Sequence, residues 1–533
     1  MNRTLLIALF VTSISHAQWS TDPANNLIVG YGITPEIASD SNGGCYITYI
    51  QQVGIYDRIL LERLNRYGYK PWGPYKQIVG ALPGQTFAEI TEDGFGGVIV
   101  SFVDVELVSP KEPPIQRLRV QRVDSSGNFL WGPNGMRVSV SETNQGDQAI
   151  VPDGYGGCVV AWKDTLSTIR LQRVDDLGTR AWGDSGLLVT ATQYTPRLVT
   201  TSSNSFIIAF GTLLKQYSLS GDPGWGGQPV NVGFGTRTIT AARDGGVIVY
   251  DGTGTSSNIL IVTQKVDSSG DFAWNSPYVL LADSAIFNVL GNPISLTATG
   301  GATFAWRKTV GGVGDLRMQI VRSDGSTFFQ FGGRPVSRVL SQKGPVGILP
   351  SDSSTSLFVW GDSRTPGGIY AQRVDTLAES FWDTNDVLLN IPQFGEMKVT
   401  TDGSGGCIGV GFHQFDFSIR ALQVSRNGLL GKVITSAENE IRLDLPIQPI
   451  LFQNYPNPFN PQTTIRFQLP HSAPIVLTLH NILGQRIRTL DSGIRSAGIH
   501  NAILEANHLP SGTYFYRLTT PQAVLTHKLL IIK

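Results

Sequence analysis

The chain has 533 residues, and its 41 basic and 41 acidic side chains give a formal net charge of zero. With only 15% charged residues and no excess of either sign, it offers no basic surface to nucleic acid or anionic lipid, and partners of these classes are excluded. The length allows more than one domain, and the 60 glycines indicate many tight turns.

Residues 1–17 are typical of a secretory signal peptide. They contain one basic residue (Arg3), an apolar run from Leu5 to Val11, and small residues up to Ala17. This run is too short to span a membrane, and no later run approaches the ~18 apolar residues that a spanning helix needs. The sequence therefore predicts an exported protein without a transmembrane segment. The alternative for these first residues is a buried N-terminal strand.

A repeated unit occupies most of the remaining chain. Its first half is a pair of glycines followed by an apolar strand that ends on an aromatic residue. The pairs begin at Gly43, Gly96, Gly156, Gly245, Gly300 and Gly405, with degenerate copies at Asn204 and Ser354. In six copies the aromatic stands five residues after the second member, at Tyr49, Phe102, Trp162, Phe210, Trp306 and Trp360. In the fifth and eighth copies it is shifted by one residue, to Tyr250 and Phe412, which indicates a bulge or a different alignment.

The second half of the unit is a small turn residue followed four places later by an aromatic. The pairs are Gly68/Trp72, Gly127/Trp131, Gly178/Trp182, Gly221/Trp225, Gly270/Trp274, Gly325/Phe329 and Ala378/Trp382. Copies are spaced by roughly 40–60 residues, as propeller blades are, and each offers four short β-prone segments between turns. Eight copies can be counted between Pro35 and Gly431. We therefore predict an all-β fold in which residues 18–435 form an eight-bladed β-propeller.

The two ends of the repeat region complement each other. In the eighth copy Lys432 stands where an aromatic is expected, whereas Trp19 stands alone before a segment similar to the one that follows Trp131. We predict that the N-terminal strand, Trp19 to Gly30, completes the last blade beside Ala421–Val424, because this leaves no open sheet edge. All ten tryptophans then have a place in the repeat, and packing between blades is favoured over sugar stacking as their role.

The three cysteines, Cys45, Cys158 and Cys407, each directly follow a glycine pair. Other copies carry Val or Ala at this position, so the cysteines are predicted to be small buried hydrophobic residues. Equivalent positions of different blades should lie farther apart than the ~4–7 Å between Cα atoms that a disulfide requires. Three free thiols are therefore expected.

Candidates for catalysis are few. His413 is the only histidine between the signal peptide and residue 440, and no His/Cys spacing of a metal site is present, so histidine- or metal-dependent catalysis is not expected. Asp104, Asp164 and Asp362 each fall two residues after a strand-ending aromatic, in loops that are predicted to share one face. Such aspartates could hold calcium or act as acid and base, but capping of their own turns is the favoured role.

Two further patterns recur. Asp-x-x-Gly-x-x-x-Trp occurs at Asp124/Gly127/Trp131, Asp175/Gly178/Trp182 and Asp267/Gly270/Trp274. It loosely resembles the Asp-box turn of sialidases, but its spacing differs and no arginine cluster or Tyr/Glu pair like theirs can be assigned, so the resemblance implies a shared turn and not a shared activity. The other pattern is an arginine in a QRVD strand, at Arg122, Arg173 and Arg373, for which packing or a solvated face is the favoured explanation.

The repeat pattern ends before a polar, Pro-containing segment, residues 436–453, which is predicted to be a linker. Within it, Ser436–Glu440 is a candidate for cleavage by a peptidase. Asn454–Pro470 then opens a separate unit with prolines that block helix, and alternating strands follow to Lys533. Residues 454–533 are predicted to form a small antiparallel β-sandwich of about seven strands.

Five motifs of this last unit occur in the order of a known family: NPFNPQTTIRFQLP, HNILGQRI, AGIH, LPSGTYFYRL and the terminal KLLIIK. On these motifs, residues 454–533 resemble the type A C-terminal sorting domain of type IX secretion. The resemblance implies an Ig-like fold and export by the type IX translocon. It also implies removal by a sortase, and a protein that is secreted or attached to the outer cell surface.

Binding or adhesion is the function expected from the sequence, with the rim loops or the central channel of the propeller as the surface for a glycan or protein ligand. A surface glycan hydrolase or lyase that uses loop carboxylates is the alternative, and a structural surface protein is the second alternative. No catalytic, metal, cofactor-binding or ligand-binding residue is assigned. No cofactor is expected, and enzymatic activity is left open.

Overall fold

The structure is a computed structural model. It describes residues 19–54, 56–73, 77–80, 84–106, 114–165, 167–202, 204–255, 258–274, 277–286, 293–310, 313–352, 354–382, 385–391, 394–431, 449–454, 457–469, 473–495, 498–506, 509–521 and 523–532. The predicted signal peptide, Lys432 and the candidate cleavage segment Ser436–Glu440 lie outside the described residues. The described residues are almost entirely β-structure, and the one helical element among them is the short turn η1 (Trp225–Gly227). The chain divides into two compact units, Met1–Val433 and Ile434–Lys533.

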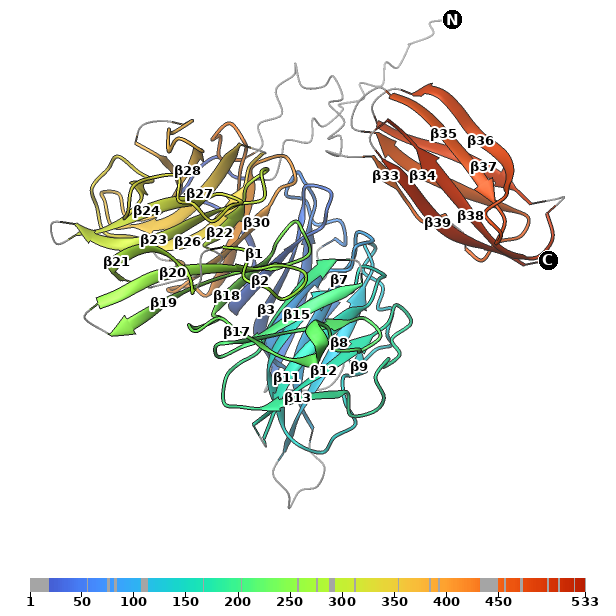
Figure 1. Ribbon diagram of the computed structural model, residues 1–533, viewed down its shortest axis with the longest axis horizontal. Coiled ribbons are helices and arrows are strands. Elements are labelled where there is room, and N and C mark those ends of the chain that lie inside the picture. The colour runs from blue at the N-terminus through green and yellow to red at the C-terminus, as the bar shows by residue number, and fades with distance from the viewer. Residues whose placement is uncertain are drawn as a thin grey trace, which may run out of the picture. The chain divides into compact units, whose positions relative to one another are not determined.

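The first unit is a series of antiparallel sheets, most of them four-stranded, that follow one another along the chain (Figure 1). The first sheet contains β2 (Ile33–Ser39), β3 (Cys45–Val53), β4 (Tyr56–Leu64) and β5 (Gln77–Ile78). The second contains β6 (Thr86–Glu92), β7 (Val98–Glu106), β8 (Ile115–Val123) and β9 (Met136–Arg137). The third contains β10 (Gln145–Pro152), β11 (Cys158–Asp164), β12 (Thr168–Val174) and β13 (Leu187–Ala191), and the fourth β14 (Arg197–Ser202), β15 (Ser205–Phe210), β16 (Leu213–Ser218) and β17 (Val230–Asn231).

The remaining strands of this unit form three further sheets. An eight-stranded sheet contains β18 (Thr238–Ala241), β19 (Val247–Thr255), β20 (Asn258–Val266), β21 (Val279–Ile286), β22 (Ile294–Leu296), β23 (Ala302–Val310), β24 (Val313–Val321) and β25 (Arg334–Pro335). The next contains β26 (Lys343–Pro350), β27 (Thr355–Asp362), β28 (Gly368–Asp375) and β29 (Val387–Asn390). The last contains β30 (Phe394–Thr401), β31 (Cys407–His413), β32 (Ser418–Val424) and the N-terminal β1 (Leu27–Tyr31).

The first strands of successive groups of four lie beside one another. β2 contacts β6, β6 contacts β10, β10 contacts β14 and β14 contacts β18; β22 contacts β26, β26 contacts β30, and β30 contacts β2. The fifth and sixth groups are joined instead through β21, which pairs with β23 within the eight-stranded sheet. The contacts therefore lead back to the first sheet, which is a propeller-like arrangement.

The glycine pairs are explained by one turn, seen in the third sheet between β10 and β11. The Oδ1 atom of Asp153 accepts hydrogen bonds from the amides two and four residues later, both at 2.8 Å. Gly156 has φ +91°, and a Cβ atom on Gly157 would lie 2.2 Å from the carbonyl oxygen of Val174, so both positions require glycine. The Oδ2 atom of Asp153 accepts a hydrogen bond from Nε of Arg173 at 2.9 Å.

The same ion pair recurs in other sheets, which explains the repeated arginines. The pairs are Asp40/Arg63, Asp93/Arg122 and Asp352/Arg373. The sequence favoured packing or a solvated face for these arginines, whereas each pairs with the aspartate that caps the neighbouring turn.

Tryptophans link neighbouring groups of strands. The indole Nε1 of Trp131, in the second sheet, donates to the carbonyl oxygen of Asp176 in the third, and a Cβ atom on Gly178 would lie 2.8 Å from the Trp131 ring. Equivalent indole hydrogen bonds join Trp19 to Arg66, Trp72 to Ser125, Trp225 to Ser268, Trp274 to Ser323 and Trp382 to Arg426. The predicted packing role is confirmed for these residues, and the second-strand Trp162, Trp306 and Trp360 are also buried.

The N-terminal strand completes the last sheet. β1 pairs with β32, with Leu27 opposite Ala421 and Tyr31 opposite Ser418. The predicted pairing is confirmed, although it covers the first half of β32 rather than Ala421–Val424. Trp19, which precedes the strand, is only 3% exposed.

Two smaller expectations have different outcomes. Cys45, Cys158 and Cys407 are free and buried, and burial raises the pKa of each thiol, so the prediction of three free thiols is confirmed. The bulge considered at Tyr250 is absent, because β19 pairs with β18 and β20 without a shift in register. At Phe412, β31 pairs regularly with β32, but its pairing with β30 shifts between Phe394 and Met397, opposite Phe412. The aromatic residue simply occupies an adjacent strand position in these two copies.

The second unit has two antiparallel sheets that share one core. One sheet contains β33 (Ile450–Leu451), β34 (Gln462–Leu469) and β37 (Gly498–Glu505). The other contains β35 (Ala473–His480), β36 (Arg486–Arg495), β38 (Gly512–Thr519) and β39 (Val524–Ile531). Phe467 and Leu504 of the first sheet pack in the same cluster as Leu477, Tyr516 and Leu529 of the second. This is a β-sandwich, and it includes β33 from the segment that the sequence assigned to the linker.

Candidate functional site

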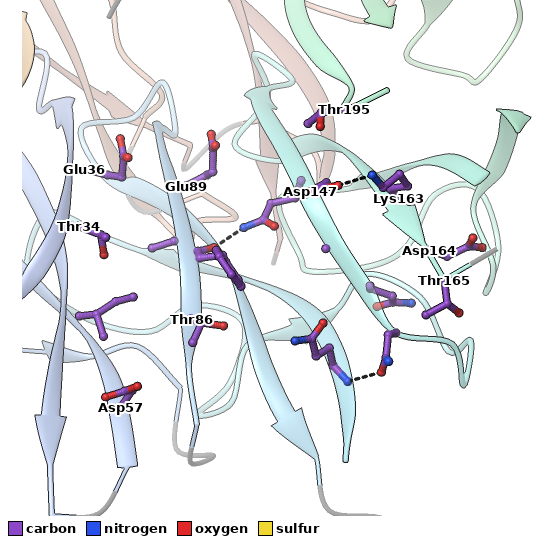
Figure 2. Close-up of a pocket in the computed structure, with 18 of the residues that line it drawn as sticks. Thr34, Glu36, Asp57, Thr86, Glu89, Asp147, Lys163, Asp164, Thr165 and Thr195 are labelled. Atoms are coloured by element: carbon purple, nitrogen blue, oxygen red, sulfur yellow. Dashed lines mark hydrogen bonds and ion pairs between the residues drawn. The ribbon is translucent and has the colours of Figure 1, made fainter. Parts of the chain in front are cut away.

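A cavity of about 840 Å³ lies among the first four sheets of the first unit (Figure 2). Its wall comes mainly from β2, β6 and β10, with contributions from β3, β4, β8 and β11 and from the start of β14. The first strands of neighbouring sheets therefore supply most of the wall. The volume is within the range of about 300–1,000 Å³ that is usual for small-molecule sites.

Three first strands are irregular where they border the cavity. β2, β6 and β10 each shift register against their second strand, and Thr34, Phe87 and Asp147 lie within these irregular segments. Their φ angles are +48°, +53° and +49°, in the left-handed region that residues other than glycine rarely occupy. Each such residue costs of order 1–3 kcal/mol, and this strain is concentrated at functional sites in proteins. All three line the cavity.

One part of the cavity wall is apolar. Phe87 is 64% exposed although it is a large aromatic residue. Ile33, Ile50 and Ala88 line the same cavity. An exposed aromatic side chain in a concave site is available for contact with the apolar face of a ligand.

Glu36 and Glu89 lie on the neighbouring strands β2 and β6, and Figure 2 shows their carboxylates side by side, pointing the same way. Lys398, from β30, forms an ion pair with Glu36 at 3.2 Å between Nζ and Oε1. Glu89 is exposed to the cavity, yet the strands around it displace much of its surrounding water. Partial burial of this kind, together with repulsion from Glu36, raises the pKa of Glu89 to about 7, against the opposing effects of Arg197 and Lys398.

The opposite wall is polar. The carboxylate of Asp147 pairs with Nζ of Lys163 at 2.5 Å, as Figure 2 shows. The amide of Gln148 donates to the carbonyl oxygen of Phe87 and so links β10 to the irregular segment of β6. Asn144 accepts a hydrogen bond from the backbone of Gln116 at 2.9 Å.

Gln145 is a buried residue of the cavity wall, only 1% exposed. Its Oε1 accepts a hydrogen bond from the amide of Leu118 at 3.0 Å, but its Nε2 has no partner among the described residues. In the second sheet the equivalent Gln85 donates to the carbonyl oxygens of Val79 and Gly80. A buried amide without a partner is costly, so this donor is a candidate for a hydrogen bond to a ligand.

The three aspartates singled out in the sequence do not form a ring. They lie within or at the ends of strands β7, β11 and β27 rather than in loops, and of the three only Asp164 lines the cavity. Asp104 is buried and accepts a hydrogen bond from Nε of Arg119 at 2.5 Å; burial raises its pKa, and the arginine opposes this rise. Asp362 is paired with Arg364, whose hydrogen bonds lower the pKa of Asp362 against the effect of burial.

Turn capping accounts for the other sequence patterns. Asp164 accepts a hydrogen bond from the amide of Thr168 and Asp362 from the amide of Arg364, as the favoured interpretation predicted, whereas Asp104 bonds to the side chain of Arg119. In the Asp-x-x-Gly-x-x-x-Trp pattern, Asp124 accepts hydrogen bonds from the amides two and four residues later. His413 contacts Asp416 at 2.8 Å. Within the described residues, no group of three or more His, Cys, Asp or Glu side chains is placed to hold a metal ion.

Stability should depend on pH through Glu89. Its pKa is raised from an ordinary value of 4.5 to about 7, so between these pH values the folded protein retains a proton that the unfolded chain has lost. Folding stability should therefore fall as pH rises through this interval and change no further above it. In Glu89→Gln this loss should disappear, which urea-denaturation midpoints at several pH values would detect. Parallel pH profiles for the wild type and the variant would contradict the assignment, and Glu379→Gln, at an exposed residue outside the cavity, is the control.

Comparison with curated proteins gives no match. Among solved structures, the chain is similar to an ulvan lyase from a polysaccharide lyase family, at 12% identity over 76% of this chain and 96% of the other, with a TM-score of 0.40. It is also similar to a quinoprotein alcohol dehydrogenase-like protein from Bacteroides thetaiotaomicron (11%; 63% and 82%; TM-score 0.35). A third similarity is to a Hadza microbial sialidase (12%; 69% and 74%; TM-score 0.27). Similarities this weak say nothing of the function.

No helix in the described part of the chain has the length and apolar character needed to cross a membrane. The C-terminal unit matches a known protein family. Residues 453–533 match the family of secretion system C-terminal sorting domains, in agreement with the resemblance found in the motifs. The protein thus carries a type IX C-terminal sorting domain, and it is secreted or attached to the outer cell surface.

Proposed function

We propose that the first unit is an eight-bladed β-propeller, closed by β1, that binds an extracellular ligand in the cavity of the first four sheets. Adhesion or ligand capture at the cell surface is the corresponding role. The succession of sheets that leads back to β2, and the tryptophans that link one sheet to the next, support the propeller.

One observation carries the binding role. Three strained residues that are not glycine, Thr34, Phe87 and Asp147, stand in irregular segments of consecutive first strands, and all three border one cavity. A strained backbone in one strand could be incidental. The register shift itself also occurs in β26 and β30, outside the cavity, so the observation particular to this site is that three strained residues meet in one cavity wall.

Binding can be tested with the mature protein, an oligosaccharide array and a panel of purified extracellular polymers such as mucin and collagen. The double variant Glu89→Gln/Asp147→Asn should weaken binding by at least about tenfold, because it removes two charged groups from the cavity without changing their size. Glu379→Gln removes an exposed carboxylate outside the cavity and should bind as the wild type does. Undiminished binding by the double variant would show that the ligand contacts another surface.

A surface glycan hydrolase or lyase is the second candidate, and one observation favours it. The pKa of Glu89 is about 7 and Glu36 lies beside it, as in sites where one carboxyl acts as acid and another as base. Asp104, Asp164 and Asp362 are each held in an arginine pair, so this role would pass to Glu36 and Glu89. Release of reducing ends that stops in Glu89→Gln would establish the enzyme, and binding without product would favour the first proposal. A structural surface protein remains the third candidate.

We propose two export signals. Residues 1–17 lead the chain to the export channel of the inner membrane, and the C-terminal sandwich, with the Ig-like fold that the resemblance implies, then engages the type IX translocon and sortase. The separate hydrophobic core of the sandwich supports this, because a tag with its own core folds whatever cargo precedes it.

A further inference from the structure

Phe87 combines two features that cost stability in an unliganded protein. Its ring is 64% exposed, and its backbone has φ +53°. The equivalent positions of the neighbouring first strands carry the small or polar residues Thr34 and Asp147. An exposed ring in a cavity wall is a platform for a flat partner with an apolar face.

Neutral hydrogen-bonding side chains line the same cavity as this ring. Thr86 and Thr195 line the cavity together with the amide side chains described above. Gln145 adds a buried amide donor that has no partner in the described part of the chain. Because the pKa of Glu89 is about 7, its carboxyl group is partly protonated near neutral pH and can donate as well as accept a hydrogen bond. A ligand that is rich in hydroxyl groups satisfies donors and acceptors of this kind together.

Charge excludes one class of ligand. Among the residues that the structure describes, five carboxylates line the cavity (Glu36, Asp57, Glu89, Asp147 and Asp164), against two cations (Lys163 and Arg197). Lys163 is already paired with Asp147. The described part of the wall therefore has no surplus of positive charge to neutralise sulfate or uronate groups, and it would repel a polyanionic glycan.

We infer that the cavity binds a neutral oligosaccharide, with the C–H face of one sugar ring stacked on Phe87 and its hydroxyl groups hydrogen-bonded to Gln145 and Glu89. This deepens the proposed binding function and depends on it. A pyranose ring has an apolar face and a polar rim, which matches an aromatic platform beside amide and carboxyl groups.

Binding of the mature protein should be measured by calorimetry against neutral hexose and N-acetylhexosamine oligomers, sulfated and uronate-containing oligomers, and a basic peptide. Neutral oligomers should bind and polyanions should not. Phe87→Ala should weaken binding at least about tenfold, and Phe87→Tyr should retain it within about threefold. Phe87→Gly removes the ring and also relieves the positive φ, so it should fold at least as well as the wild type and still lose binding.

Phe95→Ala is the matched control, because Phe95 is an exposed phenylalanine of the same sheet, at the turn after β6, that does not line the cavity. Binding of only the basic peptide that is lost in Glu89→Gln/Asp147→Asn, or of only the polyanions that is strengthened in this variant, would overturn the neutral glycan and leave the binding function standing. Neutral-glycan binding that survives Phe87→Gly and Phe87→Ala would overturn the stacking arrangement. Ligand binding unaffected by any cavity variant would overturn both proposals.

Discussion

Deletion of Ile434–Lys533 should leave the first unit folded, but the protein should be retained in the periplasm of a host that has the type IX system. The deleted residues form a compact unit of their own and include the whole match to the sorting family. Among the described residues, the core cluster of the deleted unit draws on Leu451 to Ile531 alone, so the core clusters of the first unit lose no member. Protein on the cell surface and in the medium should fall by at least about tenfold, measured by fractionation and immunoblotting, since the second export step lacks its signal.

The reverse experiment tests sufficiency. Residues 449–533, which include β33, should carry a periplasmic reporter outside the cell when they are fused behind it and a signal peptide is present. Leu477→Asp in the fusion places a charge in the buried core of the sandwich and should abolish this export. Substitution of the exposed Thr526 by Ser is the mild control. Export of the truncated protein at wild-type levels would end the sorting assignment for this unit.

The turns and links of the first unit could be predicted because their causes are local. Asp153, Gly156 and Gly157 are fixed by hydrogen bonds to amides two and four residues away and by one close carbonyl, so the same residues recur wherever the turn does. The N-terminal strand was also predictable. Trp19 stands outside the repeats, and the eighth copy lacks its aromatic residue, so the sequence itself indicates that Trp19 belongs to that copy.

The cavity could not be predicted, because its residues share a position and not a residue type. Thr34, Phe87 and Asp147 have equivalent backbone conformations in three strands, but their residue types do not predict a positive φ. Their register shifts depend on pairing with the second strand, which the repeat pattern does not encode. A phenylalanine preceding Ala-Glu, where other copies carry small or polar residues, was the only signal available.

The surroundings of the three aspartates could not be predicted from their spacing either. Asp104, Asp164 and Asp362 have identical spacing from their aromatic residues, but their surroundings differ. Arg119 pairs with Asp104, Arg170 with Asp164 and Arg364 with Asp362, and Asp164 also lines the cavity. The spacing predicted loop positions, whereas the three residues lie within or at the ends of strands and are buried. Their partner arginines and the other residues of the cavity wall lie on other strands or loops, which this spacing does not encode.

Removal of residues 19–31 from the mature protein should open the last sheet and cause aggregation. β1 is the outer partner of β32, so its loss exposes the backbone groups of Ser418 to Ala421 as an unpaired edge. Other contacts are lost with it: Lys70 donates to the carbonyl oxygen of Val29 at 2.6 Å, and the buried Asn26 donates to that of Leu389 at 3.1 Å. Light scattering and size-exclusion chromatography should show large particles where the wild type is monodisperse.

A single substitution separates the role of the tryptophan from that of the strand. Trp19 is 3% exposed, its indole donates to the carbonyl oxygen of Arg66 at 2.9 Å, and its ring lies where a Cβ atom on Gly68 would be 3.0 Å away. Trp19→Ala should lower the free energy of unfolding by about 3–5 kcal/mol, the usual cost of emptying a buried aromatic site. Ile28→Thr, at a residue of β1 that is 45% exposed, should change it by no more than about 0.5 kcal/mol. Equal midpoints of urea denaturation for Trp19→Ala and the wild type would contradict the role of the tryptophan. A monodisperse deletion variant would mean that the remaining sheets keep the first unit folded without β1.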